Sequence, residues 1–491
     1  MPMQQSVRTE IRFAALALAI AGAIVTVFYW RTLNAFFIFD DLSIIALVSP
    51  QFGKGWMDCL LPVSNGFWRP GILLPAHACL RVFGLCPLPF HLFAIAFHII
   101  ACILTGLVAG RAFPLAGGRA RWLASLLMAV NAAAFFSAAS LSNSCDSFMA
   151  CGILAGLLAW DAWLTSRSLL SGLFIYIGLL ATLMGKETGV IYPIILVLWA
   201  VCKGAPWGAY ARKAAALFLI ALAYAAIMAI LQMSNKGSYA SQGLVRLFGR
   251  DPFRQALDYC LSAWWPFIHL IDLPGCAAAL PHWALWALRF MTAFGAVALM
   301  AMAARRPALR MYAFCAASVV LIVLPPSFLR IPQHGRFVYP AVAMACITVA
   351  GLASGPRSGL RFAGMVFALL VCLCSVWSLT MSRAARGYLE ISSNVELLVD
   401  DLKRIAPNWR RDDGQGVTVL IFDHPHPGEP PWRWVYCQLI FDIFIPQSKA
   451  VIVLDAGSAV SVDRVCKFTR NGLSEEPRER RHSQPFPEHQ K

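Results

Sequence analysis

The sequence predicts an all-α polytopic membrane protein with about eleven transmembrane helices, followed by a small soluble α/β domain. Three observations predict this fold class. Hydrophobic residues make up 59% of the 491 residues and charged residues only 13%, which is more apolar than a soluble chain of this length needs. Uncharged stretches long enough to cross ~30 Å of hydrocarbon recur along the chain. Basic residues fall in every second connection between those stretches.

The membrane spans are predicted from length and apolar character. Eight clear stretches cover residues 13–30, 92–110, 122–141, 168–185, 214–233, 311–329, 337–356 and 362–382. Three weaker stretches complete the set, because 147–165 contains Asp161, 188–202 is short and 283–304 contains Arg289. Residues 254–272 are also apolar, but a crossing there would invert the later charge pattern. We therefore expect an interfacial or re-entrant helix at that place.

The orientation follows from Lys and Arg in alternate connections, because basic residues resist translocation and hold their loops in the cytoplasm. These residues are Arg8, Arg12, Arg111, Arg119, Arg121, Arg167, Lys203, Arg212, Lys213, Arg305, Arg306, Arg310, Arg357 and Arg361. The pattern predicts a protein of the cytoplasmic (inner) membrane with a cytoplasmic N-terminus and a periplasmic C-terminal domain. The formal charge of +16 belongs largely to these loops, so membrane lipids are expected partners and nucleic acid is not.

The parts of the chain outside the spans predict smaller elements. The first outer loop, residues 31–88, is long and apolar and should contain interfacial helices at 42–48 and 72–83. Together with the spans it forms a predicted transmembrane domain over residues 1–382.

The composition changes after the last span. Residues 383–473 should form a small soluble α/β domain on the outer face, with short β-like runs at 417–422 and 450–454. The charged, Pro-rich residues 474–491 should be a disordered tail.

Two adjacent carboxylates, Asp40 and Asp41, follow the first span on the outer face. Like charges near a membrane repel each other and usually have a partner, such as a cation, a divalent metal or a substrate hydroxyl. One of the two could therefore be a general base. The alternative is structural, with Asp41 as the N-cap of a solvated helix. The residues alone leave both interpretations open, and they identify no metal.

Basic residues on the same face are candidates for binding an anionic group. Lys186 and Glu187 lie at the outer end of a short span, and His334 and Arg336 lie between two later spans. Arg289 lies within a span, where an unpaired guanidinium costs at least ~2.5 kcal/mol. As hydrogen-bond donors to a bound phosphate, these cations would converge on one place. As anchors at helix ends, including a snorkelling Lys186, they need no function.

Five short motifs occur in order along the chain. They are Phe39-Asp40-Asp41, Phe67-Trp68-Arg69-Pro70, Phe90-His91-Leu92 before a helix with His98, Gly185-Lys186-Glu187-Thr188, and Arg336-Phe337-Val338-Tyr339-Pro340. In this order and on this face they resemble the polytopic glycosyltransferases of the GT-C fold, and are most similar to the protein O-mannosyltransferase-like branch. The resemblance covers roughly Asn34 to Pro340.

The resemblance implies transfer of a sugar from a polyprenyl-phosphate carrier to a glycan, lipid or protein acceptor on the outer face. In such an enzyme Asp40 would be the base and Asp41 its orienting partner or a ligand of a divalent metal. Lys186, Arg289 and Arg336 would lie near the donor phosphate. The remaining site candidates are Arg69, Asp146, Glu187, His334 and Tyr339.

The chain departs from the family in one place. Related mannosyltransferases carry H-P-x-H-x-E ahead of the Asp that aligns with Asp146, whereas this chain has Asn131, Ala132, Ala134 and Phe136 at those positions. The second acidic group is therefore absent. Two alternatives stay open: a non-catalytic member of the fold, and a flippase or transporter for a lipid-linked glycan. A flippase needs access from both faces, whereas the polar candidates gather on one.

Overall fold

The computed structural model of the chain covers the helices of the membrane domain and the strands near the C-terminus. It describes residues 2–33, 35–37, 40–50, 53–62, 67–234, 250–264, 287, 289–292, 294–295, 297–298, 301–302, 306, 309–328, 338–356, 358–381, 392–393, 395–397, 399–400, 404, 418–423, 449–450, 464–469 and 472–475.

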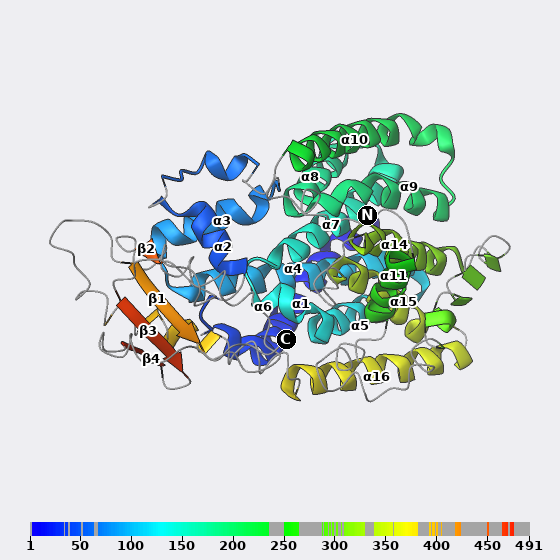
Figure 1. Cartoon of the computed structure of the whole chain (residues 1–491). Coiled ribbons are helices and arrows are strands. Elements are labelled where there is room, and N and C mark those ends of the chain that lie inside the picture. The colour runs from blue at the N-terminus through cyan, green and yellow to red at the C-terminus, as the bar shows by residue number, and fades with distance from the viewer. Residues whose placement is uncertain are drawn as a thin grey trace.

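The described helices pack into one bundle (Figure 1). Among the described residues, five helices are long and apolar enough to cross a membrane. They are α1 (Pro2–Leu33), α4 (Pro87–Ala112), α7 (Ser144–Ser166), α10 (Ala211–Ser234) and α14 (Arg310–Ser327). Further apolar helices accompany them: α3 (Pro70–Phe83), α8 (Leu169–Gly185), α9 (Tyr192–Cys202), α15 (Tyr339–Ser354) and α16 (Ser358–Met381). The chain is a polytopic α-helical membrane protein; the number of eleven crossings stays a prediction.

One predicted span is broken near its outer end. α5 (Gly117–Val130) stops at Asn131, whose side chain accepts a hydrogen bond from the backbone N–H of Ala133 at 3.0 Å. The chain continues as a 3-10 turn, η4 (Ala132–Ala134), and a short helix, α6 (Phe135–Ala139). The expectation of one regular span over these residues was wrong, because an Asn side chain that binds the backbone competes with helix continuation.

The helix α15 lies at the centre of the bundle. It packs against α4, α5, α7, α14 and α16, and its residues from Tyr339 to Ala350 are all buried. A helix that is apolar on every side suits such a position. Its many alanines allow the neighbouring helices to approach closely, as is usual between membrane helices.

α7 and α8 form a close helix pair and touch through glycines. A Cβ atom on Gly152 of α7 would lie 3.0 Å from the carbonyl oxygen of Gly178, and a Cβ on Gly178 would lie 3.0 Å from that of Gly152. The two backbones are therefore in direct contact. The start of α7 and the end of α8 lie next to each other in consequence, which matters for the site described below.

The first outer loop contains the two helices that its sequence predicts. α2 (Asp40–Val48) and α3 (Pro70–Phe83) are joined by a chain that includes the 3-10 turn η2 (Asp58–Leu60). Together with Phe37 and Phe90 their apolar side chains form a second hydrophobic cluster beside the main bundle. This cluster anchors the loop that carries the acidic pair.

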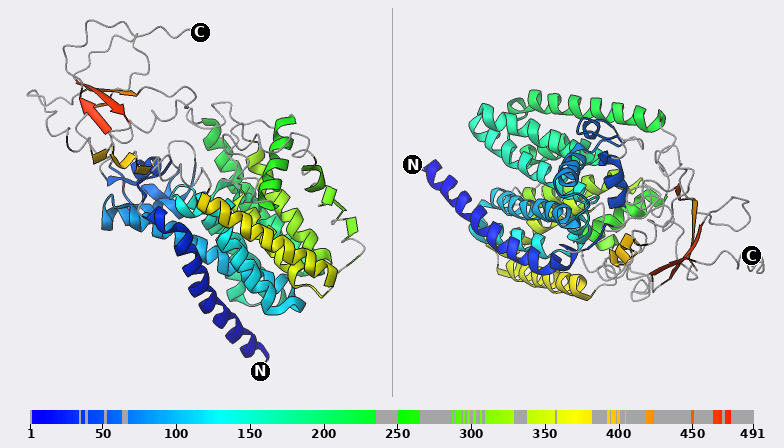
Figure 2. Two further views of the ribbon diagram at one scale, coloured as in Figure 1. Left: turned by 90° about the horizontal axis from the view of Figure 1, so that it is seen from below. Right: turned by 90° about the vertical axis from the view of Figure 1, so that its left-hand side faces the viewer.

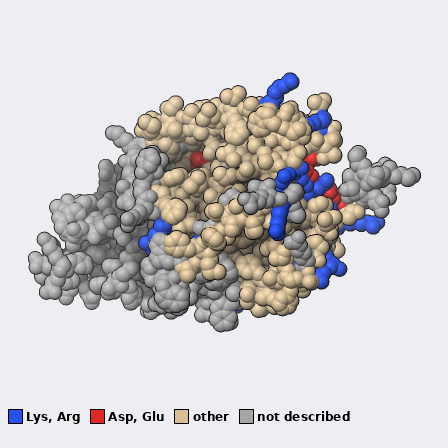
Figure 3. All heavy atoms as spheres, turned by 90° about the vertical axis from the view of Figure 1, so that its right-hand side faces the viewer, with Lys and Arg blue, Asp and Glu red and all other residues tan. Residues whose placement is uncertain are grey.

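The end of the bundle opposite this loop is held by ion pairs. Glu10 of α1 lies 2.7 Å from Arg111 of α4, and Asp161 of α7 lies 3.6 Å from Lys203 after α9. Asp161 also accepts a hydrogen bond from Trp199 Nε1 at 3.0 Å. Figure 3 shows Lys and Arg side chains gathered on one face of the molecule, with acidic side chains beside them. The structure thus groups residues of several predicted cytoplasmic connections at one end of the bundle.

Two predicted membrane segments are described only in part. α11 (Arg250–Trp264) packs against α14 and α15, while the rest of the expected interfacial helix over residues 254–272 lies outside the described residues. Within the expected span over residues 283–304, short helical pieces are described between residues 287 and 302.

Four strands near the C-terminus form one sheet in the order β2-β1-β3-β4. They are β1 (Thr418–Asp423), β2 (Lys449–Ala450), β3 (Arg464–Thr469) and β4 (Gly472–Glu475). β1 pairs in parallel with β2 and β3, and β4 is antiparallel to β3. The sheet lies at the end of the bundle away from the start of α1 (Figure 2).

The strands correspond only partly to the sequence prediction. β1 overlaps most of the first predicted β-like run and β2 overlaps the second at residue 450 alone, whereas β3 and β4 were not predicted. β4 includes Ser474 and Glu475, which pair with Lys467 and Cys466 of β3, so the tail does not start at residue 474 as expected. The α/β character of the domain, its boundary at residue 383 and the remainder of the tail lie outside the described residues and stay predictions.

The glycine contact between α7 and α8 can be tested with a matched pair of variants. In Gly152→Ala the new methyl would lie 2.8 Å from the Thr182 backbone N, so we expect a loss of about 1 to 3 kcal/mol in unfolding free energy. Gly118→Ala in α5 meets nothing within 4 Å and should be neutral or stabilising. Thermal unfolding of the purified protein in detergent measures both. Equal behaviour of the two variants would contradict the close contact.

Candidate functional site

The carboxylate of Asp41 is fully buried at the start of α2, with no exposed surface. Its Oδ1 accepts hydrogen bonds from Ser140 Oγ and from the backbone N–H of Ser142, both at 2.8 Å. Its Oδ2 is buried without a hydrogen-bond partner among the described residues. Burial raises the pKa of the Asp41 carboxyl, although the Ser142 N–H, the charge of His91 and the serine hydroxyls act in the opposite direction. The alternative of a solvated N-cap at Asp41 is therefore wrong.

Asp40 is half-buried beside it in the same first turn. The positive end of the α2 dipole favours negative charge at this place. Among the described residues no three His, Cys, Asp or Glu side chains come together as a ready-made metal site. A divalent metal at Asp40 and Asp41 would need further ligands from hydroxyl, backbone or substrate oxygens.

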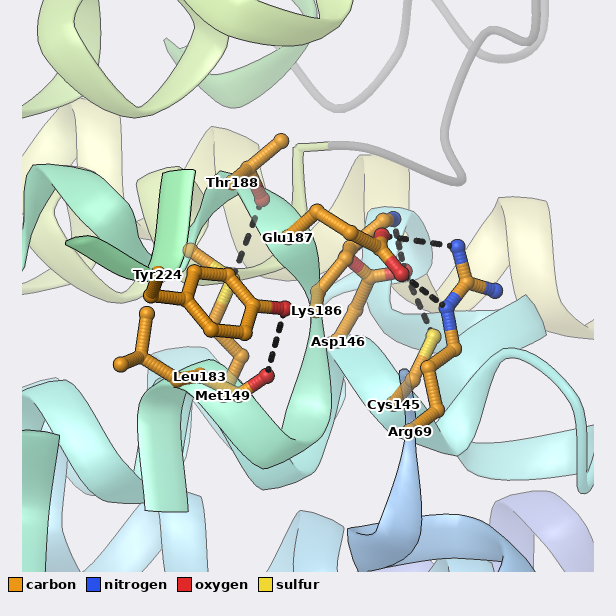
Figure 4. A network of polar contacts seen from close by, with 9 residues as sticks. All are labelled: Arg69, Cys145, Asp146, Met149, Leu183, Lys186, Glu187, Thr188 and Tyr224. Atoms are coloured by element: carbon orange, nitrogen blue, oxygen red, sulfur yellow. Dashed lines mark hydrogen bonds and ion pairs between the residues drawn. The ribbon is translucent and has the colours of Figure 1, made fainter. Parts of the chain in front are cut away.

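Lys186 and Asp146 form a buried ion pair, shown in Figure 4. The Lys186 Nζ donates to both oxygens of Asp146, at 2.7 and 2.8 Å, and the two residues are 5% and 2% exposed. Asp146 lies in the first turn of α7, and Lys186 directly follows α8. The alternative in which Lys186 snorkels at a helix end is wrong, because its charge is held by a carboxylate inside the protein.

The close packing of α8 on α7 makes this pair possible. Gly185 precedes Lys186, and a Cβ atom there would lie 2.9 Å from the backbone N of Met149 and 3.0 Å from the carbonyl oxygen of Cys145. Any larger residue would push the end of α8 away from the first turn of α7. Glycine therefore brings the Lys186 backbone within reach of Asp146.

A second ion pair adjoins the first (Figure 4). Arg69 donates through Nε and Nη2 to the two oxygens of Glu187, at 3.1 and 3.0 Å, and its guanidinium lies 4.4 Å from the ring centre of Phe67. Arg69 immediately precedes α3, whose first residue is Pro70, and Glu187 opens the 3-10 turn η5 (Glu187–Ile191). Such a bidentate geometry fixes the guanidinium plane.

The two carboxylate centres are joined by one short segment. The chain from Ser140 to Asp146 supplies both donors to Asp41 and, at its end, the partner of Lys186. Five of the predicted site residues are thus brought together around this segment and the ion pairs beside it. These residues are Arg69, Asp146, Lys186, Glu187 and Asp41, with Asp40 adjacent to the last.

The other predicted site residues lie elsewhere or are not described. Arg289 donates to Asp258 of α11 through Nε at 2.6 Å, in an ion pair of its own. The Tyr339 hydroxyl lies 2.6 Å from His98 Nδ1 inside the bundle. His334 and Arg336 lie outside the described residues.

Several polar residues of the site were not identified from the sequence. Ser140 and Ser142 bind Asp41. His91, known from the sequence only as part of a motif, contacts two backbone carbonyls near the site. A signal was present, because the run Ser137 to Ser147 is rich in serine at the outer end of a predicted span. Serine side chains near a helix end often form hydrogen bonds with neighbouring groups.

The Lys186–Asp146 pair gives a sharp test of the site geometry. Removing one partner leaves a buried charge, so Lys186→Met and Asp146→Leu should each lower the unfolding free energy by about 3 to 5 kcal/mol. The double variant should regain most of that loss, because neither charge is left behind. Unfolding of all three proteins in one detergent measures the coupling. Additive losses in the double variant would show that the two side chains do not pair.

Comparisons with known proteins show which solved structures are similar to this architecture. No protein-family model matches the chain, and no curated protein matches it in sequence. The crystal structure of ArnT from Cupriavidus metallidurans bound to undecaprenyl phosphate is similar, with a TM-score of 0.51 and 13% identity over 90% of this chain and 86% of that one. The apo form of the same protein gives a TM-score of 0.52 with the same identity and coverage.

The apo structure of the Archaeoglobus fulgidus oligosaccharyltransferase gives a TM-score of 0.47 at 14% identity, over 90% of this chain and 64% of that one. The similarity to ArnT over most of both chains confirms the expected fold, while the O-mannosyltransferase-like branch stays a prediction. This chain has the GT-C fold.

Proposed function

We propose that this protein transfers a sugar from a polyprenyl-phosphate carrier to an acceptor hydroxyl on the outer face of the membrane. The observation that carries the proposal is the arrangement of the first outer loop. Buried Asp41 is bound to the segment that leads to Asp146, and Lys186 and Arg69 lie beside that segment. Carboxylates and cations close to each other are what the reaction needs. The GT-C fold, seen in ArnT with a bound polyprenyl phosphate, supports the same proposal.

The chemistry assigns one role to the acids and another to the cations. Asp40 takes the proton from the acceptor hydroxyl as its oxygen bonds to the anomeric carbon. The bond from that carbon to the phosphate oxygen breaks at the same time, and the electron pair leaves with the carrier phosphate. The configuration is inverted because attack and departure occur on opposite faces of the sugar. Asp41, held by Ser140 and Ser142, orients Asp40.

The departing phosphate gains negative charge and is stabilised by fixed cations. Lys186 and Arg69 are the described cations at the site, and both are already bound to carboxylates. A phosphate would therefore share their donors with Asp146 and Glu187. Arg289 and Arg336 are assigned to the phosphate by the family resemblance alone.

The finer features of the proposal rest on the motifs. They favour the protein O-mannosyltransferase-like branch, and the acceptor is a glycan, a lipid or a protein. We place the protein in the cytoplasmic membrane with its N-terminus in the cytoplasm and with the site and the C-terminal domain in the periplasm. The basic loops and the grouping of Arg111 and Lys203 at the far end of the bundle support this orientation.

The acidic pair is the first test of the reaction. In reconstituted vesicles Asp40→Asn should lower the rate of sugar transfer by about 10²- to 10⁴-fold, the usual effect of losing a general base. Asp41→Asn should be impaired to a smaller degree. Asp58→Asn, in the same loop, is the control, because its carboxylate only accepts a bond from the Gly55 N–H at 2.7 Å. Near-normal transfer by Asp40→Asn at normal protein level would rule out Asp40 as the general base.

The proposed role of Asp41 predicts that the rate of sugar transfer, measured in the same assay, depends on pH. Protonation of Asp41 would remove the negative charge that favours proton transfer to the neighbouring Asp40. Because burial raises the pKa of Asp41, transfer should decline on acidification at a higher pH than an ordinary carboxyl would give.

The orientation can be tested with single cysteines in an otherwise cysteine-free protein. A membrane-impermeant maleimide applied to intact cells with a permeabilised outer membrane should label a cysteine at Ser64 and one at Gly387, but not one at Gly117. Disruption of the inner membrane should then expose Gly117 to the reagent. Labelling of Gly117 in intact cells, or protection of Gly387, would overturn the proposed arrangement of the outer face.

A further inference from the structure

His91 contacts two backbone carbonyls from segments that are far apart in the sequence. Its Nε2 lies 2.8 Å from the oxygen of Ala35, just before α2, and its Nδ1 lies 2.8 Å from the oxygen of Ala139, at the end of α6. The residue is completely buried near the start of α4. Phe37 lies nearly parallel to the imidazole ring, with 6.5 Å between ring centres.

Both contacts require His91 to donate. A carbonyl oxygen only accepts hydrogen bonds, so each ring nitrogen needs a hydrogen to bind its carbonyl. A neutral imidazole has one N–H and one lone pair, and the lone pair would face an oxygen at 2.8 Å. The ring with two N–H groups satisfies both carbonyls. Its positive charge acts on Asp41, the acidic group that α2 brings toward it.

The peptide that His91 binds is held on its other side as well. The carbonyl of Ala35 and the N–H of Phe36 belong to one peptide group, and the Phe36 N–H donates to Ser392 Oγ at 2.5 Å. Ser392 follows the last membrane helix and is buried, and Val399, a little further along, packs into the hydrophobic cluster of the outer loop. The plane of this peptide group is thereby fixed a few residues before Asp40.

We propose that His91 is a positioning residue that clamps the chain leading to Asp40 and Asp41 onto the segment leading to Asp146. The two segments that carry the carboxylates are otherwise linked by the contacts of Asp41 with Ser140 and Ser142. His91 adds a second connection, through the backbone, at a distance from the reacting groups. Its effect on transfer rests on the proposed function, whereas the clamp itself is a property of the fold.

Two amide variants separate the two halves of the clamp. The side-chain N of glutamine can take the place of Nε2, so His91→Gln keeps a donor for Ala35 and loses the one for Ala139. The side-chain N of asparagine can take the place of Nδ1, so His91→Asn keeps the donor for Ala139 and loses the one for Ala35. His77→Asn is the control, because His77 is a buried histidine of α3 that contacts one carbonyl among the described residues, that of Val48, at 2.9 Å.

The first readout is hydrogen exchange of the full chain in nanodiscs, which needs no activity. We expect amides 36–42 to exchange at least about tenfold faster in His91→Asn than in wild type, and to change little in His91→Gln and His77→Asn. Ser392→Ala removes the other contact of the same peptide and should act on amides 36–42 in the same direction. Wild-type exchange of this segment in both His91→Asn and Ser392→Ala would overturn the clamp, as would a single protonated ring nitrogen at His91 by ¹⁵N NMR.

The second readout is transfer, with kcat and KM measured separately. A misplaced Asp40 carboxylate is poorly aligned with the acceptor hydroxyl, whereas the affinity of the protein for the sugar donor is unaffected. His91→Asn should therefore lower kcat by about 10- to 100-fold, with KM for the carrier nearly unchanged. His91→Gln should restore most of kcat. A loss carried by KM alone would overturn the positioning role. If amides 36–42 exchange faster in His91→Asn than in wild type but the wild-type protein transfers no sugar, the clamp stands and the proposed function is refuted.

Discussion

The buried ion pair between Lys186 and Asp146 is the interaction on which the rest of the site depends. Two charges removed from water are stable only when they meet at close range with good geometry, and this pair has both. The geometry requires α7 and α8 to touch, which the glycines Gly152 and Gly185 allow. Once Lys186 is held, the adjacent Glu187 faces Arg69, and the start of α3 is tied to the same end of the bundle.

The charge balance of the site has a chemical consequence. Lys186 and Arg69 are each matched by a carboxylate, so the four groups together carry no net charge when ionised. The site can therefore be buried near the membrane without an anionic ligand. A phosphate that enters must compete with Asp146 and Glu187 for the same donors. Because of this competition, the cations would bind the phosphate more strongly in the transition state, where its negative charge grows, than in the bound ground state.

The sequence predicted the helices better than the contacts between them. Apolar length alone located most membrane helices, because hydrocarbon thickness sets the length of a span. It missed the break at Asn131, where an amide side chain binds the backbone within an otherwise apolar stretch. The motifs identified Asp146 and Lys186 separately, but their pairing depends on helix packing across 40 positions of sequence. The role of His91 depends on two carbonyls, and no residue pattern reports where a backbone carbonyl lies.

We propose that this GT-C fold binds a carrier phosphate at the outer end of the bundle. The most direct measurement is thermal unfolding of the purified protein with a polyprenyl phosphate and, in parallel, with the polyprenol of the same length. Binding at a hundredfold excess over Kd stabilises a protein by about 2.7 kcal/mol. We expect stabilisation of this order by the phosphate and much less by the alcohol. Equal stabilisation by both, or by neither, would contradict it.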